Sequence, residues 1–195
     1  NTSTVLEVGT AVVSNDPLAG NSIRLVRDWS DPDCSDLTTV DALNPLLTYD
    51  SVTFDQTVYP SIWIGAQKWV AANFADTLGG SIPYVENQAA WSALTTSGYT
   101  YYNAGVDPIE CVNGYLYNFW AAEEINAYLV SIGSLYRLPV PDDLNELANY
   151  LGGASVAGGK LKSANPALLT HWNTPNTGAD NSSGFSAVGA GIRSS

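Results

Sequence analysis

Few side chains in this chain could catalyse a reaction, and they lie far apart in the sequence. His171 is the single histidine, so a catalytic triad or a histidine-based metal site would have to include it. Its segment is rich in Gly, Asn, Thr and Ser, where we expect the imidazole to pack and to hydrogen-bond within a loop. Two pairs of carboxylates are adjacent in the sequence on expected helices, so the two side chains of each pair point in different directions. Glycosidases require two carboxyl groups about 5 to 9 Å apart on either side of the substrate bond, and these pairs cannot provide that arrangement. They are Glu123 with Glu124 and Asp142 with Asp143. The sequence therefore predicts no catalytic residue and no enzyme.

Two oxygen-rich segments could bind a hard cation such as Ca²⁺. One is an acidic run that lacks the spacing and the central Gly of an EF-hand loop, so we interpret it as a solvated linker. Its members are Asp28, Asp31, Asp33 and Asp36. The other could hold Ca²⁺ through Asp180 and Asn181, and a ligand such as a sugar through Asn173 and Asn176. Turn formation by side-chain-to-backbone hydrogen bonds is the competing interpretation of this second segment.

Three tyrosines form a candidate contact surface. Tyr101 and Tyr102 are adjacent, and side chains of adjacent residues on a strand face opposite ways, so at least one of them or Tyr99 should be exposed. Exposed tyrosine suits contact with a protein or a glycan. A strand covered by a loop is the alternative.

Cys34 and Cys111 are the only cysteines. In an exported protein such a pair commonly forms one disulfide, which by loop-closure entropy would stabilise the fold by roughly 4 kcal/mol. Two unpaired thiols are the alternative, because two cysteines define no framework pattern.

The elements that position these residues are short. Helices are expected over residues 119–132, with Asn118 as the cap, and over residues 142–151, while residues 152–183 are expected to be mostly loop. The expected strands cover residues 4–14, 21–28, 51–54, 58–64 and 67–71. Two helices beside short strands, with long loops between them, indicate an α+β fold.

The second of these helices has the clearest local pattern. Pro141 suits the first helical position because it has no N–H to leave unpaired there. We attribute Asp142 and Asp143 to the helix dipole, which favours negative charge in the first turn. Gly152 can adopt the left-handed conformation that ends a helix. Between these ends runs one apolar stripe, made of Leu144, Leu147, Ala148 and Leu151.

Composition limits the partners of the chain. Its 195 residues are 45% hydrophobic and 13% charged, which is enough for one sizeable core. A net charge of −12 repels phosphate backbones, so we expect no nucleic-acid binding. No apolar run reaches the length of a membrane span and no signal peptide is evident, so we expect no membrane insertion. Because the chain begins with Asn1 and contains no Met, we expect it to be processed or partial.

Several segments carry a family resemblance. They are Gly65-Ala66-Gln67-Lys68-Trp69, Gly114-Tyr115-Leu116-Tyr117-Asn118, Arg137-Leu138-Pro139, Gly158-Gly159-Lys160-Leu161, His171-Trp172-Asn173 and Ser183-Gly184-Phe185-Ser186. In this order and at this spacing, over roughly residues 55 to 193, the chain resembles the Fibrobacter succinogenes major paralogous (FISUMP) domain.

The resemblance implies a C-type-lectin-like domain in the form found in formylglycine-generating enzymes. Those enzymes use a cysteine pair near the C-terminus for copper-dependent oxidation, and no such pair follows Cys111, so their activity does not carry over. Family members are secreted or phage-borne. We therefore expect an extracellular, non-enzymatic structural or adhesion module with no required cofactor. A phage virion protein (fibre, decoration or tail-associated) is the first expectation, a bacterial cell-surface adhesin or lectin the second, and a formylglycine-generating-type enzyme the third. Expected partners are copies of the chain, other virion or surface proteins, or a host-surface glycan or protein.

The resemblance also suggests a domain organisation. Residues 55–195 would form the FISUMP-like domain without its C-terminal strands, and residues 29–54 a linker. Residues 20–28 resemble the strand that normally ends the family's fold, yet they stand at the front. Residues 1–28 would then end a preceding unit, which we favour, or fill an edge of the same unit.

Overall fold

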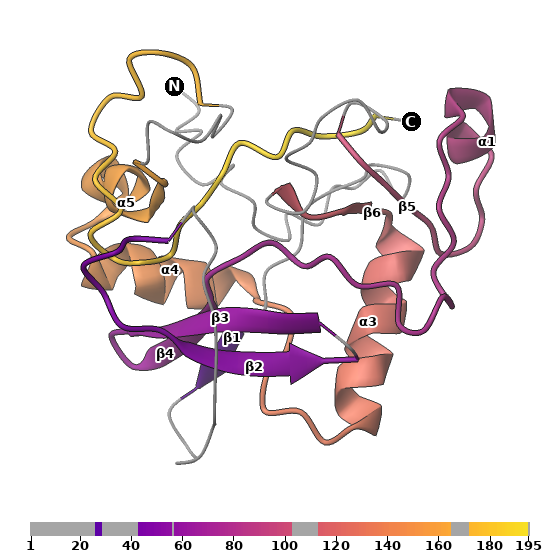
Figure 1. Ribbon diagram of the computed structural model, residues 1–195, viewed down its shortest axis with the longest axis horizontal. Helices are drawn as coiled ribbons and strands as arrows, with labels where there is room; N and C mark the ends of the chain where they lie inside the picture. Colours follow the sequence, from indigo (N-terminus) through magenta and orange to yellow (C-terminus); the bar gives the residue numbers. More distant parts are fainter. Residues whose placement is uncertain (1–25, 29–42, 56, 103–112, 165–171, 195) are drawn as a thin grey trace.

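The computed structural model describes residues 26–28, 43–55, 57–102, 113–164 and 172–194 of the chain (Figure 1). These residues form two antiparallel sheets and several helices, which confirms the α+β class. The strands are β1 (Val26–Asp28), β2 (Asp50–Phe54), β3 (Thr57–Ile64), β4 (Gln67–Val70), β5 (Tyr99–Thr100) and β6 (Leu116–Tyr117). The helices are α1 (Gln88–Ser92), α3 (Phe119–Ser131), α4 (Pro141–Tyr150) and α5 (Ala154–Leu161). Figure 1 shows α4 and α5 together at one end of the main sheet, with α3, β5 and β6 at the other.

The main sheet has the order β1-β4-β3-β2. Strands β2, β3 and β4 lie where the sequence predicted strands. The proposed linker extends too far, however, because residues 50–54 of it pair with β3 along their whole length. Phe54 at the end of β2 is 1% exposed and belongs to the core, so these residues are part of the folded unit.

Strand β1 fills the edge of this sheet beside β4. Val26 pairs with Trp69 and Asp28 with Gln67, in antiparallel register. Residues 26–28 therefore belong to the same sheet as the rest of the fold, which corrects our preference for assigning them to a preceding unit. Strand β4 lies between β1 and β3, and all four of its residues are buried.

Helix α3 follows the predicted pattern closely. Its buried face consists of Ala121, Ile125 and Leu129, spaced four residues apart. Ile132 was expected on the same face but is 49% exposed, because the helix ends at Ser131 and the chain turns away.

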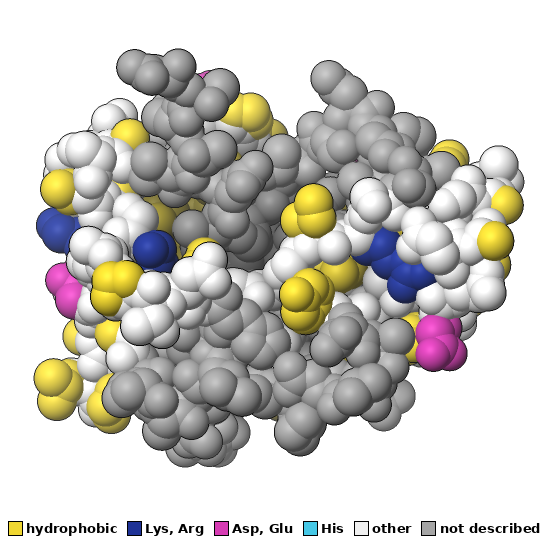
Figure 2. Space-filling model, turned by 90° about the horizontal axis from the view of Figure 1, so that it is seen from above, with side chains coloured by type: hydrophobic (Ala, Val, Ile, Leu, Met, Phe, Trp, Pro, Cys, Tyr) yellow, Lys and Arg dark blue, Asp and Glu magenta, His cyan; other side chains and the backbone are white. Residues whose placement is uncertain are grey.

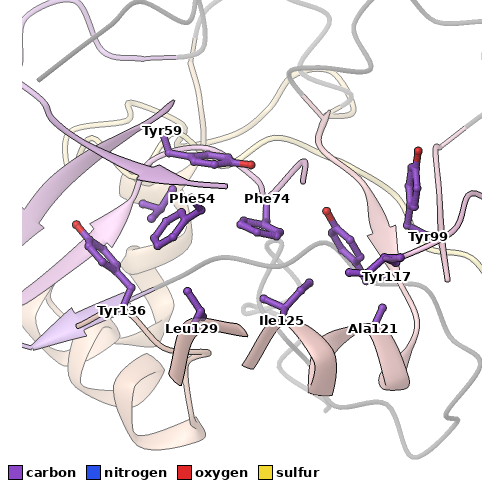
Figure 3. Packing of buried hydrophobic residues seen from close by; sticks show 11 residues of the cluster. Phe54, Tyr59, Phe74, Tyr99, Tyr117, Ala121, Ile125, Leu129 and Tyr136 are labelled. Carbon is purple, nitrogen blue, oxygen red and sulfur yellow. The ribbon is translucent and has the colours of Figure 1, made fainter. Parts of the chain in front are cut away.

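The first core cluster packs β2 and β3 against α3. In Figure 3, Phe54 and Phe74 face Ile125 and Leu129 of the helix, and the Tyr59 ring lies over Phe74. The Tyr59 and Phe74 rings are stacked, with centroids 5.5 Å apart and planes 13° from parallel. Such aromatic pairs add specific geometry to the apolar area that they bury.

The side chain of Asn118 forms several hydrogen bonds at the N-terminus of α3. It is 1% exposed, and its Oδ1 accepts hydrogen bonds from the N–H groups of Ala121 at 3.0 Å and Gly98 at 3.1 Å. Its Nδ2 donates to the Thr96 carbonyl at 2.8 Å. The side chain thus caps the helix and also holds the loop that leads into β5.

We expect Asn118→Ala to lower the free energy of unfolding by about 2–3 kcal/mol, because a cap and buried loop hydrogen bonds are lost together. Urea unfolding would measure the change. Asn87→Ala is the matched control: Asn87 caps the exposed five-residue helix α1 through one bond to Ala90 N–H, so about 1 kcal/mol or less is expected there. Equal losses in the two variants would contradict the central role of Asn118.

The second core cluster packs β3 and β4 against α4 and α5. Trp69 is fully buried, and its ring centroid lies 5.4 Å from that of Phe185. Leu147 of α4 and Leu161 of α5 are each 1% exposed in the same cluster. This cluster connects the sheet to the segment after residue 172.

Helix α5 was not predicted, since it lies inside the expected loop 152–183. Its Gly158 and Gly159 weaken local helix propensity. Gly159 is nevertheless required by packing, because a Cβ there would lie 2.2 Å from the Gly178 carbonyl oxygen. In the part of the chain that the structure describes, no helix has both the length and the apolar character needed to span a membrane.

Candidate functional site

The tyrosines of the predicted contact surface form part of a larger aromatic cluster. Tyr99 in β5 stacks on Tyr115, with centroids 4.5 Å apart. The Tyr101 ring meets the Tyr115 ring edge to face, with centroids 5.1 Å apart, and its centroid lies 5.2 Å from that of the tilted Tyr84 ring. A parallel bridge between Tyr84 and Tyr99 places the Tyr84 segment beside β5. The rings therefore run from the core next to Tyr117 to the surface.

Burial changes steadily along this cluster. Tyr99 is 9% exposed, Tyr101 is partly buried, and Tyr84 and Tyr102 are 41% and 42% exposed. Burial, with a hydrogen bond and charge repulsion from Tyr101, raises the pKa of Tyr99 to about 12. The Tyr99 phenol is therefore neutral across physiological pH. The outer Tyr84 ring rests on the rings of Tyr99 and Tyr101, so little conformational entropy is lost when it makes contact.

The C-terminal segment closes one side of the cluster. A Cβ on Gly191 would lie 2.2 Å from the Tyr102 ring, so only glycine lets the backbone run against that ring. Ile192 follows and is 73% exposed. We call Tyr84, Tyr101, Tyr102 and Ile192 the tyrosine surface.

Arg193 fixes this segment in place. Its guanidinium lies 5.2 Å from the Trp91 ring centroid, in cation–π geometry. Nη1 donates to Thr100 Oγ1 at 2.9 Å, and Nη2 donates to the Glu86 carbonyl at 2.6 Å. Figure 2 views the molecule from the side of the C-terminal segment and shows hydrophobic side chains next to cationic groups, with few acidic groups among the described atoms.

The oxygen-rich loop after residue 172 is engaged mainly in its own structure. Asn181 is 3% exposed; its Oδ1 accepts from Ser186 N–H at 2.9 Å and its Nδ2 donates to Ser186 Oγ at 3.0 Å. Asp180 Oδ1 accepts from Ser182 N–H at 2.9 Å. These local bonds confirm the turn-forming interpretation of both residues. The described residues contain no group of three or more His, Cys, Asp or Glu that could hold a metal ion.

Asn173 and Asn176 do not join the tyrosines. Asn173 is exposed, and Asn176 Nδ2 donates to the Ser163 carbonyl at 3.3 Å. Figure 1 places this loop near α5, at the other end of the molecule from β5. The predicted ligand-binding residues are thus divided between two places. Cys34, Cys111 and His171 lie outside the described residues.

Sequence reasoning missed Tyr84 and Arg193. Tyr84 follows Ile82-Pro83 in a loop, where no periodicity relates it to the other tyrosines. Arg193 reaches Glu86 across a separation of 107 residues. The one sequence signal that could have identified Arg193 is the scarcity of cations, with only seven Lys and Arg in the chain.

Comparison with known proteins identifies a family. The family model described as Fibrobacter succinogenes major domain matches residues 62–195, while β1 and β2 precede this region. No curated protein and no solved structure matches the chain. The likeness to C-type lectins therefore stays a prediction.

Proposed function

The chain belongs to the Fibrobacter succinogenes major domain family, and from that premise we propose that it is a non-enzymatic structural and adhesion module displayed outside the cell. The observation that carries the proposal is the tyrosine surface, in which the exposed Tyr84 ring rests on the rings of Tyr99 and Tyr101 and the exposed Tyr102 ring lies against the backbone of Gly191. Tyr84 and Tyr102 are the exposed members of this surface, and tyrosine combines a large apolar ring with a polar hydroxyl. The ligand would be a glycan ring or an apolar protein surface.

The chemistry of this surface favours contact over catalysis. The tyrosine rings can stack on the C–H face of a sugar, and the rings and Ile192 can pack on an apolar side chain. The cation at this site, Arg193, is directed inward to Trp91, Thr100 and Glu86 and so acts as a support. A net charge of −12 argues against nucleic acid as the partner.

We place the module first on a phage virion, as part of a fibre, decoration or tail-associated protein, and second on a bacterial cell surface. The low fraction of charged residues, 13%, and the abundance of small polar residues support an extracellular structural setting. In a virion, copies of the chain or other virion proteins would be the partners. Light scattering with size-exclusion chromatography would test this: a stable homo-oligomer supports the virion assignment, and a monomer of 20.7 kDa contradicts it.

We expect the double variant Tyr84→Ala/Tyr102→Ala to bind host cells, or the glycans they display, at least about 10-fold more weakly, since aromatic residues dominate such contacts. A glycan array followed by titration calorimetry would measure the change. Tyr150→Ala is the matched control, because Tyr150 is 65% exposed on α4, away from this surface. Unchanged binding in the double variant, or an equal loss in the control, would refute the assignment.

A further inference from the structure

Two carboxylates meet where the β2–β3 hairpin contacts the loop after β4. Asp55 stands at the turn of the hairpin with φ +48°, and its Oδ2 accepts a hydrogen bond from Gly79 N–H at 2.7 Å. Asp76 Oδ1 accepts from Leu78 N–H at 2.9 Å. Each carboxylate thus uses one oxygen to hold the same loop. The two side chains also lie within hydrogen-bonding reach of each other.

Asp76 is the unusual member of this pair. It is 5% exposed, and no described donor meets hydrogen-bond geometry at its buried Oδ2. Burial raises the pKa of Asp76, and the charge of Asp55 beside it raises that pKa further, against the opposing hydrogen bond from Leu78 N–H. The Thr57 hydroxyl also lies close enough to Asp76 to lower its pKa.

No described side chain compensates this negative charge. The ion pairs of the described residues join Lys68 to Asp50 and Arg137 to Asp143, so none includes Asp55 or Asp76. The other titratable groups that face Asp76 are phenols. Tyr117 donates its hydroxyl to the Asp76 carbonyl at 2.7 Å, and burial raises the pKa of this phenol and that of Tyr59. Both are therefore neutral.

We propose that Asp55 and Asp76 bind one divalent cation of the Ca²⁺ class between their remaining oxygens, with the Thr57 hydroxyl and water completing the coordination. Carboxylate, hydroxyl and water oxygens are the ligands that Ca²⁺ prefers. A cation here would compensate the charge of a carboxylate that is buried and has no hydrogen-bond donor at Oδ2. It also ties the hairpin to the loop over the first core cluster. The site is independent of the tyrosine surface and would stand if that assignment failed.

Protons compete with the cation for the same oxygens. Affinity for the cation is therefore expected to fall as the pH is lowered. Few protein ligands and several waters are typical of weak extracellular sites, with dissociation constants of about 10⁻⁴ to 10⁻³ M.

Terbium luminescence tests the proposal on the full chain. Tb³⁺ replaces Ca²⁺ at oxygen sites, and Tyr117, bonded to the Asp76 backbone, would sensitise its emission. We expect emission that Ca²⁺ displaces, and a melting temperature that is higher in Ca²⁺ than in EDTA. Asp55→Asn should weaken Tb³⁺ binding at least about 10-fold by removing one of the two charges. Asparagine tolerates the positive φ and still accepts from Gly79, so this variant should fold.

Asp180→Asn is the matched control, because it removes one charge from the loop where the sequence predicted Ca²⁺ and keeps an acceptor for Ser182 N–H. Sensitised emission should persist in this variant. Two results would overturn the proposal. The first is that the native chain gives no sensitised emission. The second is that Asp180→Asn abolishes the emission while Asp55→Asn leaves it intact. In the first case the carboxylates share a proton; in the second the cation lies in the later loop.

Discussion

Replacing Phe185 with alanine is expected to lower the free energy of unfolding by about 3–5 kcal/mol, the range for deleting a fully buried aromatic ring. Phe185 is 1% exposed and packs its ring against Trp69 in the centre of the second core cluster. It also fixes the loop after residue 172 to the sheet. Two backbone bonds beside it, Ser163 N–H to the Ala187 carbonyl and Ala187 N–H to the Leu161 carbonyl, should exchange hydrogen faster in the variant.

Urea unfolding and hydrogen exchange would measure these effects. Phe119→Ala is the matched control, since Phe119 is 41% exposed at the start of α3 and its removal should cost about 1 kcal/mol or less. Phe185→Leu keeps most of the buried volume and should recover much of the loss. If Phe185→Ala and Phe119→Ala were equally destabilising, Phe185 would not hold the loop to the core.

Local patterns were sufficient for α3 and α4. Asn118 caps α3 as predicted, and α4 begins at Pro141. Gly152 follows α4 with φ +100°, as a helix stop requires. These features depend on residues within one or two turns of each other, so the sequence alone contains the information. The strands of the main sheet were likewise recognisable from their β-branched and aromatic residues.

Helix α5 could not be predicted because its glycines are explained only by a distant contact. Gly159 approaches Gly178, nineteen positions later, too closely for any side chain. Ala157 and Leu161 are buried and supply the apolar face that makes this short helix stable. Tertiary packing here outweighs propensity. The edge position of β1 is also a long-range property, since its partner β4 lies about forty residues away.

The candidate site was predictable only in part. Alternation along the strand indicated an exposed tyrosine, and Tyr102 is exposed. Tyr84 and Arg193 reach the cluster through contacts that no local pattern encodes. The assignment of Asp142 and Asp143 to the helix dipole alone was wrong for Asp143, which is 6% exposed and bonded to a specific partner.

Asp143 joins the start of α4 to the preceding segment. Arg137 donates through Nη1 at 2.5 Å to Oδ2 and through Nη2 at 2.8 Å to Oδ1, a two-pronged ion pair. Val140 N–H donates to Oδ2 at 2.6 Å. One carboxylate therefore satisfies a helix-terminal N–H and a cation together.

Burial alone would raise the pKa of Asp143, but the hydrogen bonds from Arg137 and Val140 and the charge of Arg137 outweigh burial and lower it. The folded-state pKa of Asp143 therefore lies below its unfolded-state pKa, which is about 3.9. The carboxylate stabilises the fold fully at pH values above this unfolded-state pKa. The stabilisation is lost as the pH falls through the folded-state pKa. The contribution of Asp76 to stability changes with pH in the opposite direction, because a raised folded-state pKa stabilises the fold at low pH.

We therefore expect Asp143→Asn to lower the free energy of unfolding by about 2–3 kcal/mol at pH 7, less than a fully buried pair would lose because the Arg137 side chain is 40% exposed. Urea unfolding of the native chain and of Asp143→Asn between pH 7 and pH 2 would measure the difference in their free energies of unfolding. Asp76 contributes equally to both proteins, so the difference reports on Asp143. The difference should stay constant down to about pH 5 and shrink below pH 4. Asp142→Asn, in the same turn, should cost about 0.5 kcal/mol by the helix dipole alone. A difference for Asp143→Asn that does not change with pH would mean that the Asp143 carboxylate is not held ionised by Arg137.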